Sequence, residues 1–483
     1  MTMVRMSMSP HHSRLARAGR SPRRITPSKS NILMIIIAVL VLLWLYQFAT
    51  VYHAATTIAK TADGHVSLQT PPSRSTASTT VATDTGTTIP IDTQQATKTA
   101  KATIGFAVSI TGCGSDPITE GAAVLKHSIH RASIHGNSGG QYDYALYAIY
   151  HPSAAECALP LQALDFTMLK RETPVAVADI QGDFLRSKIE ANGCCGEKEL
   201  IKLEAYTLTQ HEIIVHLDLD VLVLKPMDDL FDVMLANTPD ATAAAVAKVQ
   251  PSLMRPNEPL PVASSATLNA FYTLDYNMVG PKNEHKPVQG GFLVLRPDQA
   301  VYEEYKAIVK EGDFRDGSGW GGLVGPFHGS MTFQGIIPYY YNVLHTGQAV
   351  EVNRCIYNQM CDNPRTGRTL NDVVSGVCRT NEDECEDCRS RSLEDVVTTH
   401  FTLCQKPWWC LAHTQDAIQH RLCRKLHHEW YKIRSELEQS WGRSGRGPGS
   451  FDKDQFYGYC KASGKNGYFP IAKPYGGPVD EAQ

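Results

Sequence analysis

A chain of 483 residues with 42% hydrophobic and 20% charged content is long enough to bury a sizeable core and exceeds one ordinary domain. Its formal net charge is −3, but residues 1–31 hold seven basic residues and no acidic one, so the rest of the chain is net acidic. An acidic main body argues against a general nucleic-acid-binding protein.

The first element expected along the chain is a membrane anchor at 32–51. This run of 20 residues carries no charge, and its length is sufficient to cross a bilayer as a helix. Because the basic tail 1–31 precedes it, the positive-inside tendency predicts that the tail is cytoplasmic and that the remaining chain is translocated. A cleaved signal peptide is the alternative, although its apolar core is usually about 7–15 residues long. We favour an uncleaved type II anchor in the Golgi or another secretory-pathway membrane, with a luminal head.

The segment that follows, 52–101, contains 18 Ser or Thr and few large apolar residues. Such a segment buries too little apolar surface to offset the entropy cost of ordering it. It is predicted to be a disordered stem, either O-glycosylated or acting as a regulatory tail.

Strands and helices alternate from residue 102 onwards. The expected strands are 104–110, 144–150, 174–178, 213–217 and 292–295, and the expected helices are 119–132, 199–208, 299–310 and an amphipathic helix at 418–441. This alternation predicts an α/β fold in which helices flank a Rossmann-like mixed sheet, in a single catalytic domain at 102–442. Residues 251–287 are predicted to be a long loop. The glycine-rich tail, 443–483, is predicted to be loosely ordered.

Thirteen cysteines suit an oxidising lumen, where disulfides are the default. Five of them lie at 355–388, and Cys385 and Cys388 form a C-x2-C pair that could suggest zinc. A four-ligand zinc site usually needs a second such pair, so disulfides are favoured in this Cys-rich insertion. The odd number of cysteines leaves one thiol free or intermolecular.

The strongest chemical signal is the stretch 213–231, in which Asp218 and Asp220 follow an apolar run. Extended chain sends residues i and i+2 to the same side, so both carboxylates can face one point. Two carboxylates this close are expected to raise each other's pKa and are costly to desolvate. A divalent cation removes this conflict, and hard oxygen ligands suit Mn²⁺ or Mg²⁺. The pair also falls at the carboxyl end of a strand, where ligands gather in such sheets. Asp228 and Asp229, further along, are expected to cap a helix.

Four segments, in this order, resemble the retaining glycosyltransferases of family 8, the glycogenin-like enzymes with a GT-A fold. They are the stretch 200–231, VQGGFLVLRPD (288–298), MTFQGIIPYYY (331–341) and HFTLCQKPW (400–408). The resemblance covers about residues 102–410, and its specificity lies in the set and its order, because a single D-x-D is common. It implies a GT-A fold, here in a membrane-anchored form.

The resemblance also implies roles for individual residues, with Mn²⁺ (or Mg²⁺) bridging the diphosphate of a nucleotide sugar, most simply a UDP-sugar. The implied metal ligands are Asp218, Asp220 and His400; the implied catalytic residues are Gln334 and Lys202; and the implied nucleotide-sugar contacts are Lys406, Gln289, Gly290, Gly291 and Leu219. Imidazole is a common ligand of transition metals. A cation aimed at the leaving diphosphate stabilises the charge that develops there.

Three positions depart from the family pattern. Phe333 stands where the glycogenin-like enzymes have an aspartate, Gln289 precedes the glycine pair, and Leu403 stands where a glycine is usual. Without a carboxylate at Phe333, front-face substitution is favoured over double displacement.

The sequence thus predicts an enzyme that moves a sugar from a nucleotide-sugar donor to a luminal glycan or glycoprotein, with no nucleic-acid partner. A non-catalytic glycan-binding head of the same fold is an alternative, supported by Phe333. A phosphohydrolase of the haloacid-dehalogenase type is another alternative, but its motif has Thr or Val at the position where this chain has Leu222.

Overall fold

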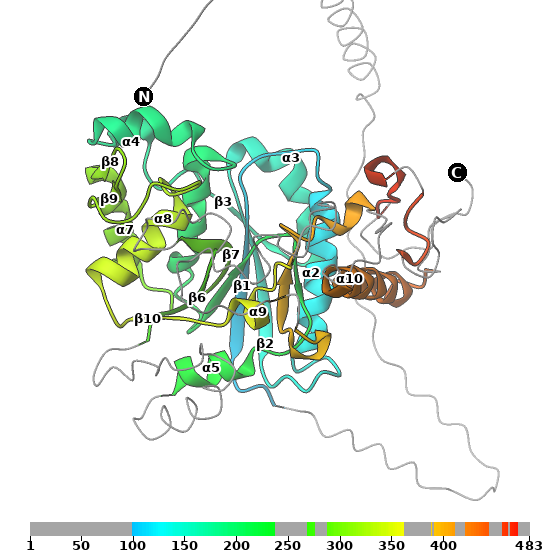
Figure 1. Ribbon diagram of the computed structural model, residues 1–483. Helices are drawn as coiled ribbons and strands as arrows, with labels where there is room; N and C mark the ends of the chain where they lie inside the picture. The colour runs from blue at the N-terminus through cyan, green and yellow to red at the C-terminus, as the bar shows by residue number, and fades with distance from the viewer. Residues whose placement is uncertain are drawn as a thin grey trace, which may run out of the picture. The chain divides into compact units, whose positions relative to one another are not determined.

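A seven-stranded mixed sheet lies at the centre of the structure, with helices on both of its faces (Figure 1). The computed structural model describes residues 99–236, 268–275, 287–361, 388, 391–410, 421–443, 456–461 and 464–471, all within one compact unit, Gln94–Gln483. The predicted cytoplasmic tail and anchor, and the stem up to residue 98, lie outside these residues. Within the described ranges, no helix is both long and apolar enough to cross a membrane.

The sheet combines parallel and antiparallel pairing. Its order from edge to edge is β10 (Ala349–Glu351), β6 (Ala270–Leu274), β7 (Val288–Leu295), β4 (Ile214–Leu217), β1 (Thr103–Ile110), β2 (Asp143–Tyr150) and β3 (Thr167–Lys170). The strands β3, β2, β1 and β4 are parallel, whereas β7 runs antiparallel to both of its neighbours. The predicted α/β class with a mixed, mostly parallel sheet is confirmed.

Two short antiparallel ladders lie beside the main sheet. β5 (Val221–Val223) pairs with β11 (Thr398–His400), and β8 (Phe314–Arg315) pairs with β9 (Gly319–Trp320). The first ladder places His400 opposite Val221. Because β5 follows β4 after only three residues, this pairing carries a distant part of the chain to the carboxyl end of β4.

The helices are mostly short. The α-helices are α2 (Ile118–Ala132), α3 (Ala155–Ala158), α4 (Asp183–Lys188), α5 (Asp228–Leu235), α7 (Gln299–Glu311), α8 (Phe333–Tyr339), α9 (Arg354–Tyr357) and α10 (Arg421–Ser440). The 3₁₀ segments are η1 (Pro152–Ala154), η2 (Leu159–Leu164), η3 (Val177–Asp179), η4 (Ile189–Ala191), η5 (Gly196–Thr207), η8 (Leu393–Asp395), η9 (Pro407–Trp409) and η11 (Gly464–Gly467), and η6 (Tyr340–Leu344) is a π-helical turn.

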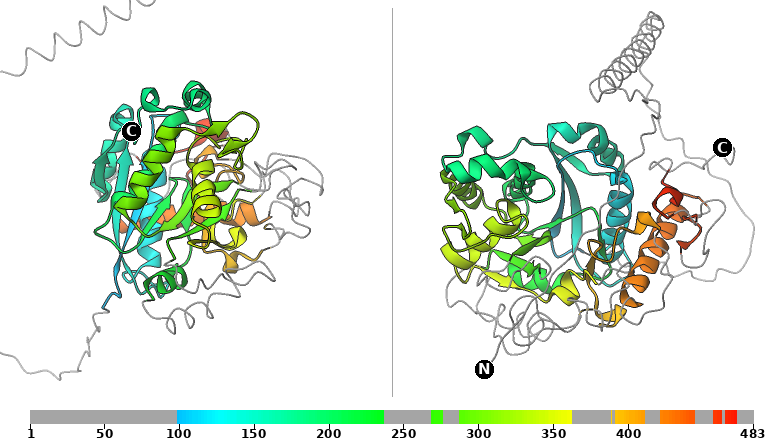
Figure 2. Two further views of the ribbon diagram at one scale, coloured as in Figure 1. Left: turned by 90° about the vertical axis from the view of Figure 1, so that its left-hand side faces the viewer. Right: turned by 45° about the horizontal axis from the view of Figure 1, so that its top comes forward.

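Strand alternation divides the core into two clusters, one on each face of the sheet. Ile104, Phe106 and Val108 of β1 pack with the α2 side chains, whereas Ala107 of the same strand packs with η5, α7 and α8 on the opposite face. The two views of Figure 2 show the same division, with α7 and α8 on one side and α2 with α10 on the other.

Four disulfides connect described cysteines: Cys113–Cys157, Cys355–Cys388, Cys404–Cys423 and Cys410–Cys460. The preference for disulfides in the Cys-rich insertion is confirmed at Cys355 and Cys388. Because Cys388 is bonded to Cys355, it offers no thiolate to a zinc ion. The rest of that insertion, 362–387, lies outside the described residues.

Three local predictions are wrong. Residues 174–178 form no strand, because Pro174 has no N–H to donate to a ladder, and the third strand is β3. The expected loop 251–287 contains β6, all five residues of which are buried. The helix expected to be capped by Asp228 and Asp229 begins at Asp228 itself, with Met227 at the cap position.

The chain after Trp441 is also more ordered than expected where it is described. Phe456, Tyr459 and Cys460 are buried against α10. The backbone of Ile471 donates to the buried Glu120 of α2, and Arg434 of α10 ion-pairs with that carboxylate at 3.1 Å. This buried charge network holds the tail segment to two helices.

Candidate active site

The site is built where four strands meet. β4 ends at Leu217, Asp218 and Asp220 lie in the turn before β5, and His400 ends β11. Backbone hydrogen bonds fix this turn, since Asp218 N donates to Gly291 O of β7 at 3.2 Å and Phe401 N donates to Asp220 O at 2.9 Å. Backbone hydrogen bonds thus tie the turn with the two aspartates to β7 and to the residue that follows β11.

The three predicted metal ligands converge. His400 Nε2 lies 3.3 Å from Oδ1 of Asp220 and 3.8 Å from Oδ2 of Asp218. One ligand atom from each residue can be chosen such that all lie within 4.8 Å of one another. The predicted juxtaposition of residues separated by 180 positions is thus present.

Each carboxylate presents its other oxygen to a lysine. Lys202 Nζ lies 2.9 Å from Asp218 Oδ1 and also donates to the backbone oxygen of Gly290 at 3.0 Å. Lys406 Nζ donates to Asp220 Oδ2. The two carboxylates therefore lie between a common imidazole nitrogen on the inside and one ammonium group each on the outside.

The lysines reverse the expected pKa shifts. Burial alone raises the pKa of Asp218 and Asp220, but Lys202, Lys406 and His400 outweigh it, and both pKa values are lowered. The pKa of Lys202 is raised, because the carboxylates of Asp218 and Glu199 outweigh the burial of its ammonium. The expected repulsion is present, since the charge of Asp220 raises the pKa of Asp218, but Lys202 and His400 outweigh it.

The arrangement fits a divalent cation. Two carboxylate oxygens and an imidazole nitrogen form a donor set that suits Mn²⁺, and harder cations less well because of the imidazole. His400 Nδ1 is buried with no hydrogen-bond partner among the described residues, which leaves the ring held by its packing. A Cβ at Gly291 would lie 2.4 Å from His400 Cε1 and 2.9 Å from Asp218 Oδ2. Only glycine leaves room there for the three ligands.

The predicted sugar-side residues surround Gly290. A Cβ at Gly290 would lie 3.4 Å from both Gln334 Cγ and Lys202 Nζ. Gln334 is buried at the first turn of α8, and Gln289 Oε1 accepts from Gly291 N at 2.5 Å. The structure thus brings Lys202, Gln334, Gln289 and the glycine pair together beside the three candidate metal ligands. The side chain of Leu219 instead packs against the apolar cluster under α2.

Sequence reasoning missed two polar residues behind the site. Glu199 lies one helical turn before Lys202 in η5, and its Oε1 is 3.9 Å from Lys202 Nζ. The i to i+3 spacing of the two residues in the sequence could have indicated this pair. His216 is fully buried beside Phe333 and shares a hydrogen bond with Ser109 at 2.8 Å. Burial, and then the charge of Lys202, lower the pKa of His216 to about 3, so it is neutral near pH 7.

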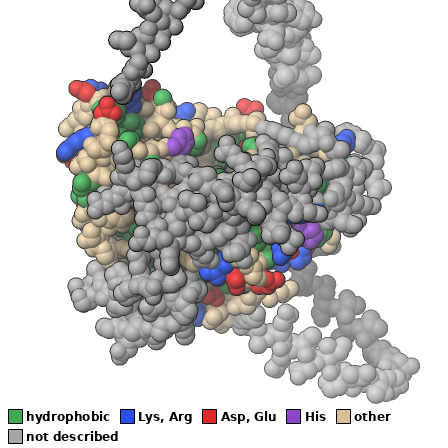
Figure 3. Space-filling view, in the orientation of Figure 1, with side chains coloured by type: hydrophobic (Ala, Val, Ile, Leu, Met, Phe, Trp, Pro, Cys, Tyr) green, Lys and Arg blue, Asp and Glu red, His purple; other side chains and the backbone are tan. Residues whose placement is uncertain are grey.

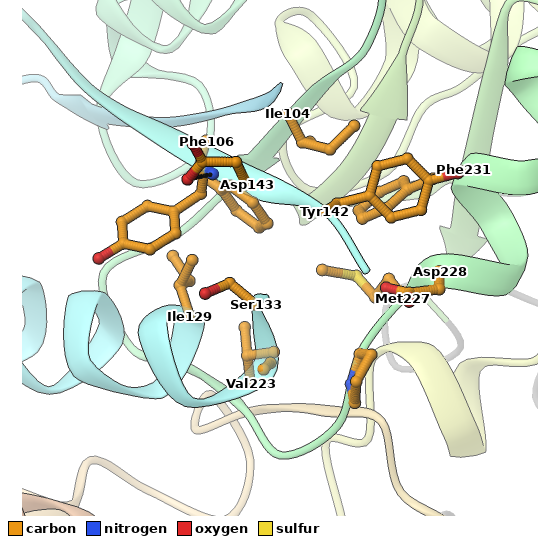
Figure 4. A pocket seen from close by; sticks show the side chains of 13 residues that line it. Ile104, Phe106, Ile129, Ser133, Tyr142, Asp143, Val223, Met227, Asp228 and Phe231 are labelled. Atoms are coloured by element: carbon orange, nitrogen blue, oxygen red, sulfur yellow. Dashed lines mark hydrogen bonds between the residues drawn. The ribbon is translucent and has the colours of Figure 1, made fainter. Parts of the chain in front are cut away.

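A small recess elsewhere on the molecule is separate from this site. It lies among the beginnings of β1 and β2, the end of α2 and the start of α5 (Figure 4). Its lining includes Ile104, Phe106 and Phe231 with Asp143 and Asp228 near them. None of the predicted site residues lines it. The candidate active site lies at the other ends of β1 and β4.

On the face shown in Figure 3, the described residues that remain visible present both basic and acidic side chains.

No known protein-family profile matches the chain. No curated protein matches it either. Among solved structures, it is similar to the bifunctional glycosyltransferase WbbM (12% identity, TM-score 0.36, covering 71% of this chain and 52% of that one). It is also similar to mouse xyloside xylosyltransferase 1, with 13% identity and a TM-score of 0.36 over 62% of this chain and 98% of that one. A third similar structure is the galactosyltransferase LgtC in complex with donor and acceptor sugar analogues, with 13% identity and a TM-score of 0.35 over 70% of this chain and 95% of that one. The chain spans about half the length of WbbM. At these TM-scores the likeness supports no conclusion about function, which rests on the residues above.

Proposed function

We propose that this protein is a divalent-cation-dependent retaining glycosyltransferase of the family 8, GT-A type, which moves a sugar from a UDP-sugar to a glycan or glycoprotein. The observation that carries the proposal is the convergence of Asp218, Asp220 and His400 beside the glycine pair, with Lys202 and Lys406 flanking it. A nucleotide diphosphate needs a cation and additional positive charge, and this site offers a donor set for the first and two ammonium groups for the second.

The roles follow from the positions. Asp218, Asp220 and His400 would hold the cation, Mn²⁺ by preference, which when bound supplies positive charge for the leaving diphosphate. Lys406, at 23% side-chain exposure, can turn from Asp220 to a phosphate oxygen. Lys202 is more deeply held and would stay at the sugar side, near Gly290 and Gln334.

Retention by front-face substitution suits the residue at position 333. Phe333 is fully buried, with Lys202 Nζ 5.6 Å from the centre of its ring, so no carboxylate acts there as a nucleophile. In this scheme the bond from the anomeric carbon to the diphosphate oxygen breaks and the bond to the acceptor oxygen forms on the same face. The departing diphosphate takes the hydroxyl proton of the acceptor. Gln334 would hold the sugar by hydrogen bonding.

The proposal also includes the cellular location of the enzyme. The charge-free run 32–51 behind a basic tail supports a type II anchor in the Golgi or another secretory-pathway membrane. The disulfides of the head agree with an oxidising lumen.

The test is a donor screen with the full-length protein. Release of UDP from a panel of UDP-sugars is measured with and without Mn²⁺, for the wild type, for Asp220→Asn and for the control Asp316→Asn, which alters an exposed carboxylate in the turn between β8 and β9. The proposal predicts Mn²⁺-dependent release that Asp220→Asn abolishes and the control retains. Release that persists in Asp220→Asn would contradict the metal assignment. No release with any donor and any divalent cation would favour a non-catalytic glycan-binding head.

A further inference from the structure

Two adjacent cysteines, Cys194 and Cys195, lie in a tight turn between η4 and η5 and belong to no disulfide. Their sulfur atoms are 2.8 Å apart. Glycines on both sides, Gly193 (φ +66°) and Gly196 (φ +61°), adopt left-handed conformations that only glycine takes without strain. The turn therefore brings two thiols together on a backbone that can readjust.

This turn touches both sides of the candidate site. Cys194 Sγ lies 3.1 Å from Glu199 Oε1, the same oxygen that lies 3.9 Å from Lys202 Nζ. Asn192, two residues before Cys194, accepts from Met331 N at 3.1 Å in the segment leading to Gln334. The turn therefore contacts Glu199, which lies beside Lys202, and the segment that leads into α8.

We propose that Cys194 and Cys195 form a reversible thiol–disulfide site, closed by exchange with a disulfide such as oxidised glutathione, and that its closure strengthens cation binding at Asp218 and Asp220. The exchange has two steps. The Cys195 thiolate attacks one sulfur of the external disulfide, whose S–S bond breaks and releases one thiolate. Cys194, having lost its proton to solvent, then attacks the Cys195 sulfur in the mixed disulfide and releases the second thiolate. Two protein thiols are oxidised, and the external disulfide is reduced to two thiols.

The environment assigns the attacking role to Cys195. A hydrogen bond from Cys194 lowers the pKa of the Cys195 thiol to about 7, against the opposing effect of burial, and Thr111 contributes in the same direction. The pKa of Cys194 is raised by that same hydrogen bond, by burial and by Glu199. A thiol with a pKa near the ambient pH is the better nucleophile in thiol–disulfide exchange.

The coupling to the site follows from the shared oxygen of Glu199. While Cys194 is reduced, its one thiol proton can be donated either to Cys195 Sγ, 2.8 Å away, or to Oε1, 3.1 Å away, whereas the Lys202 ammonium lies 3.9 Å from Oε1, beyond hydrogen-bond distance. Closure removes the thiol proton, so Oε1 becomes available to Lys202 and is expected to draw the ammonium from Asp218 towards Glu199. A cation bound by Asp218 then meets less positive charge. This second step rests on the proposed metal site, whereas formation of the disulfide does not.

The disulfide is tested on the full-length protein with oxidised glutathione, followed by alkylation of remaining thiols and mass spectrometry. The tryptic peptide Ile189–Lys198 contains Cys194 and Cys195 and no other cysteine. We expect it to lose the mass of two hydrogen atoms and to escape alkylation. In Cys194→Ser the mixed disulfide has no resolving thiol, so glutathione remains on Cys195, whereas Cys195→Ser is expected to stay unmodified. A peptide alkylated at both cysteines after this treatment would overturn the proposal.

The coupling is tested by titrating the oxidised and reduced forms with Mn²⁺ and following free Mn²⁺ by electron paramagnetic resonance. We expect the oxidised form to bind about fivefold more tightly, and Glu199→Gln to remove the difference. Equal affinities in the two forms would overturn the coupling and leave the metal site standing. If neither form binds Mn²⁺, the proposed metal site fails with it, while the mass-spectrometric result is unaffected.

Discussion

The ammonium group of Lys202 lies 2.9 Å from Oδ1 of Asp218, on the side of the carboxylate that faces away from His400. The ammonium group of Lys406 likewise forms an ion pair with Oδ2 of Asp220. In the absence of a cation, the two lysines thus compensate the charge of the two aspartates. The lysines thus offset the cost of burying two carboxylates side by side.

Removing one of these lysines is expected to change metal affinity and turnover in opposite directions. In Lys202→Met, no ammonium opposes a cation beside Asp218, so Mn²⁺ affinity should rise about tenfold, or about 1.4 kcal/mol. Turnover should fall because the sugar side loses its donor. Mn²⁺ titration and UDP release report the two effects. Lys198→Met, at a half-buried lysine of the same segment that contacts Ser153 rather than the site, serves as the control. A joint loss of affinity and turnover would argue against the compensating role.

The close approach of β7 to the ligands predicts a strong effect of a single methyl group. Gly291→Ala places a Cβ within 2.4 Å of His400 and should weaken Mn²⁺ binding by at least about tenfold. Gly290→Ala meets its neighbours at an ordinary 3.4 Å and should leave Mn²⁺ affinity within about twofold. Calorimetric titration distinguishes the two variants. Equal losses, or a harmless Gly291→Ala, would mean that His400 is not a ligand.

The buried charge network of the tail predicts a large loss of stability. Arg434 is fully buried and ion-pairs with Glu120 at 3.1 Å and with Glu438 at 3.0 Å. Arg434→Met leaves Glu120 without its main partner and should lower the free energy of unfolding by about 3–5 kcal/mol, as measured in urea.

Arg131→Met is the matched control for that measurement, because Arg131 contacts Glu436 at 3.3 Å with both side chains about a third exposed. It should cost at most about 1 kcal/mol. Similar losses in the two variants would show that burial of the network does not matter.

A buried histidine predicts acid sensitivity. Burial lowers the pKa of His427 in α10 to about 4, from an ordinary value near 6.5, despite hydrogen bonds to backbone oxygens. The folded protein thus favours the neutral ring of His427. The stability of the folded protein is therefore unaffected by this histidine above about pH 6.5 and decreases as the pH falls towards 4. At pH 5.5 the loss is about 1.4 kcal/mol. In His427→Gln the unfolding free energy should depend less on pH across this window. His428→Gln, at the half-buried neighbour in the same helix, is the matched control for the substitution itself.

The sequence predicted β4 and β7 but not β5 and β11, which also carry the candidate site. Strand geometry predicted that Asp218 and Asp220 share a side, and the resemblance to family 8 implied that His400 joins them. The pairing of Lys202 with Asp218 was not predictable, because helical and strand periodicities say nothing about which charges face each other across elements. For the same reason the sequence indicated the repulsion between the two aspartates but not the lysines that outweigh it.

Other errors came from long-range packing. The strand β6 lies within a Pro- and Asn-rich region whose local composition indicates a loop, and only its place between β10 and β7 makes it a strand. The tail was predicted to be loose from its glycine content. The tail is held in place by the buried carboxylate of Glu120, which lies more than 340 residues earlier and accepts hydrogen bonds from both Tyr468 and Ile471.

The most direct test of the central claim is an anomalous difference map at the manganese edge, from crystals of the protein grown with Mn²⁺ and UDP. We predict a single strong peak at bonding distance from Asp218, Asp220 and His400, with the diphosphate of UDP on its open side near Lys406. A peak at another cluster, such as Cys194, Cys195 and Glu199, or UDP bound with no metal at the aspartates, would contradict the account.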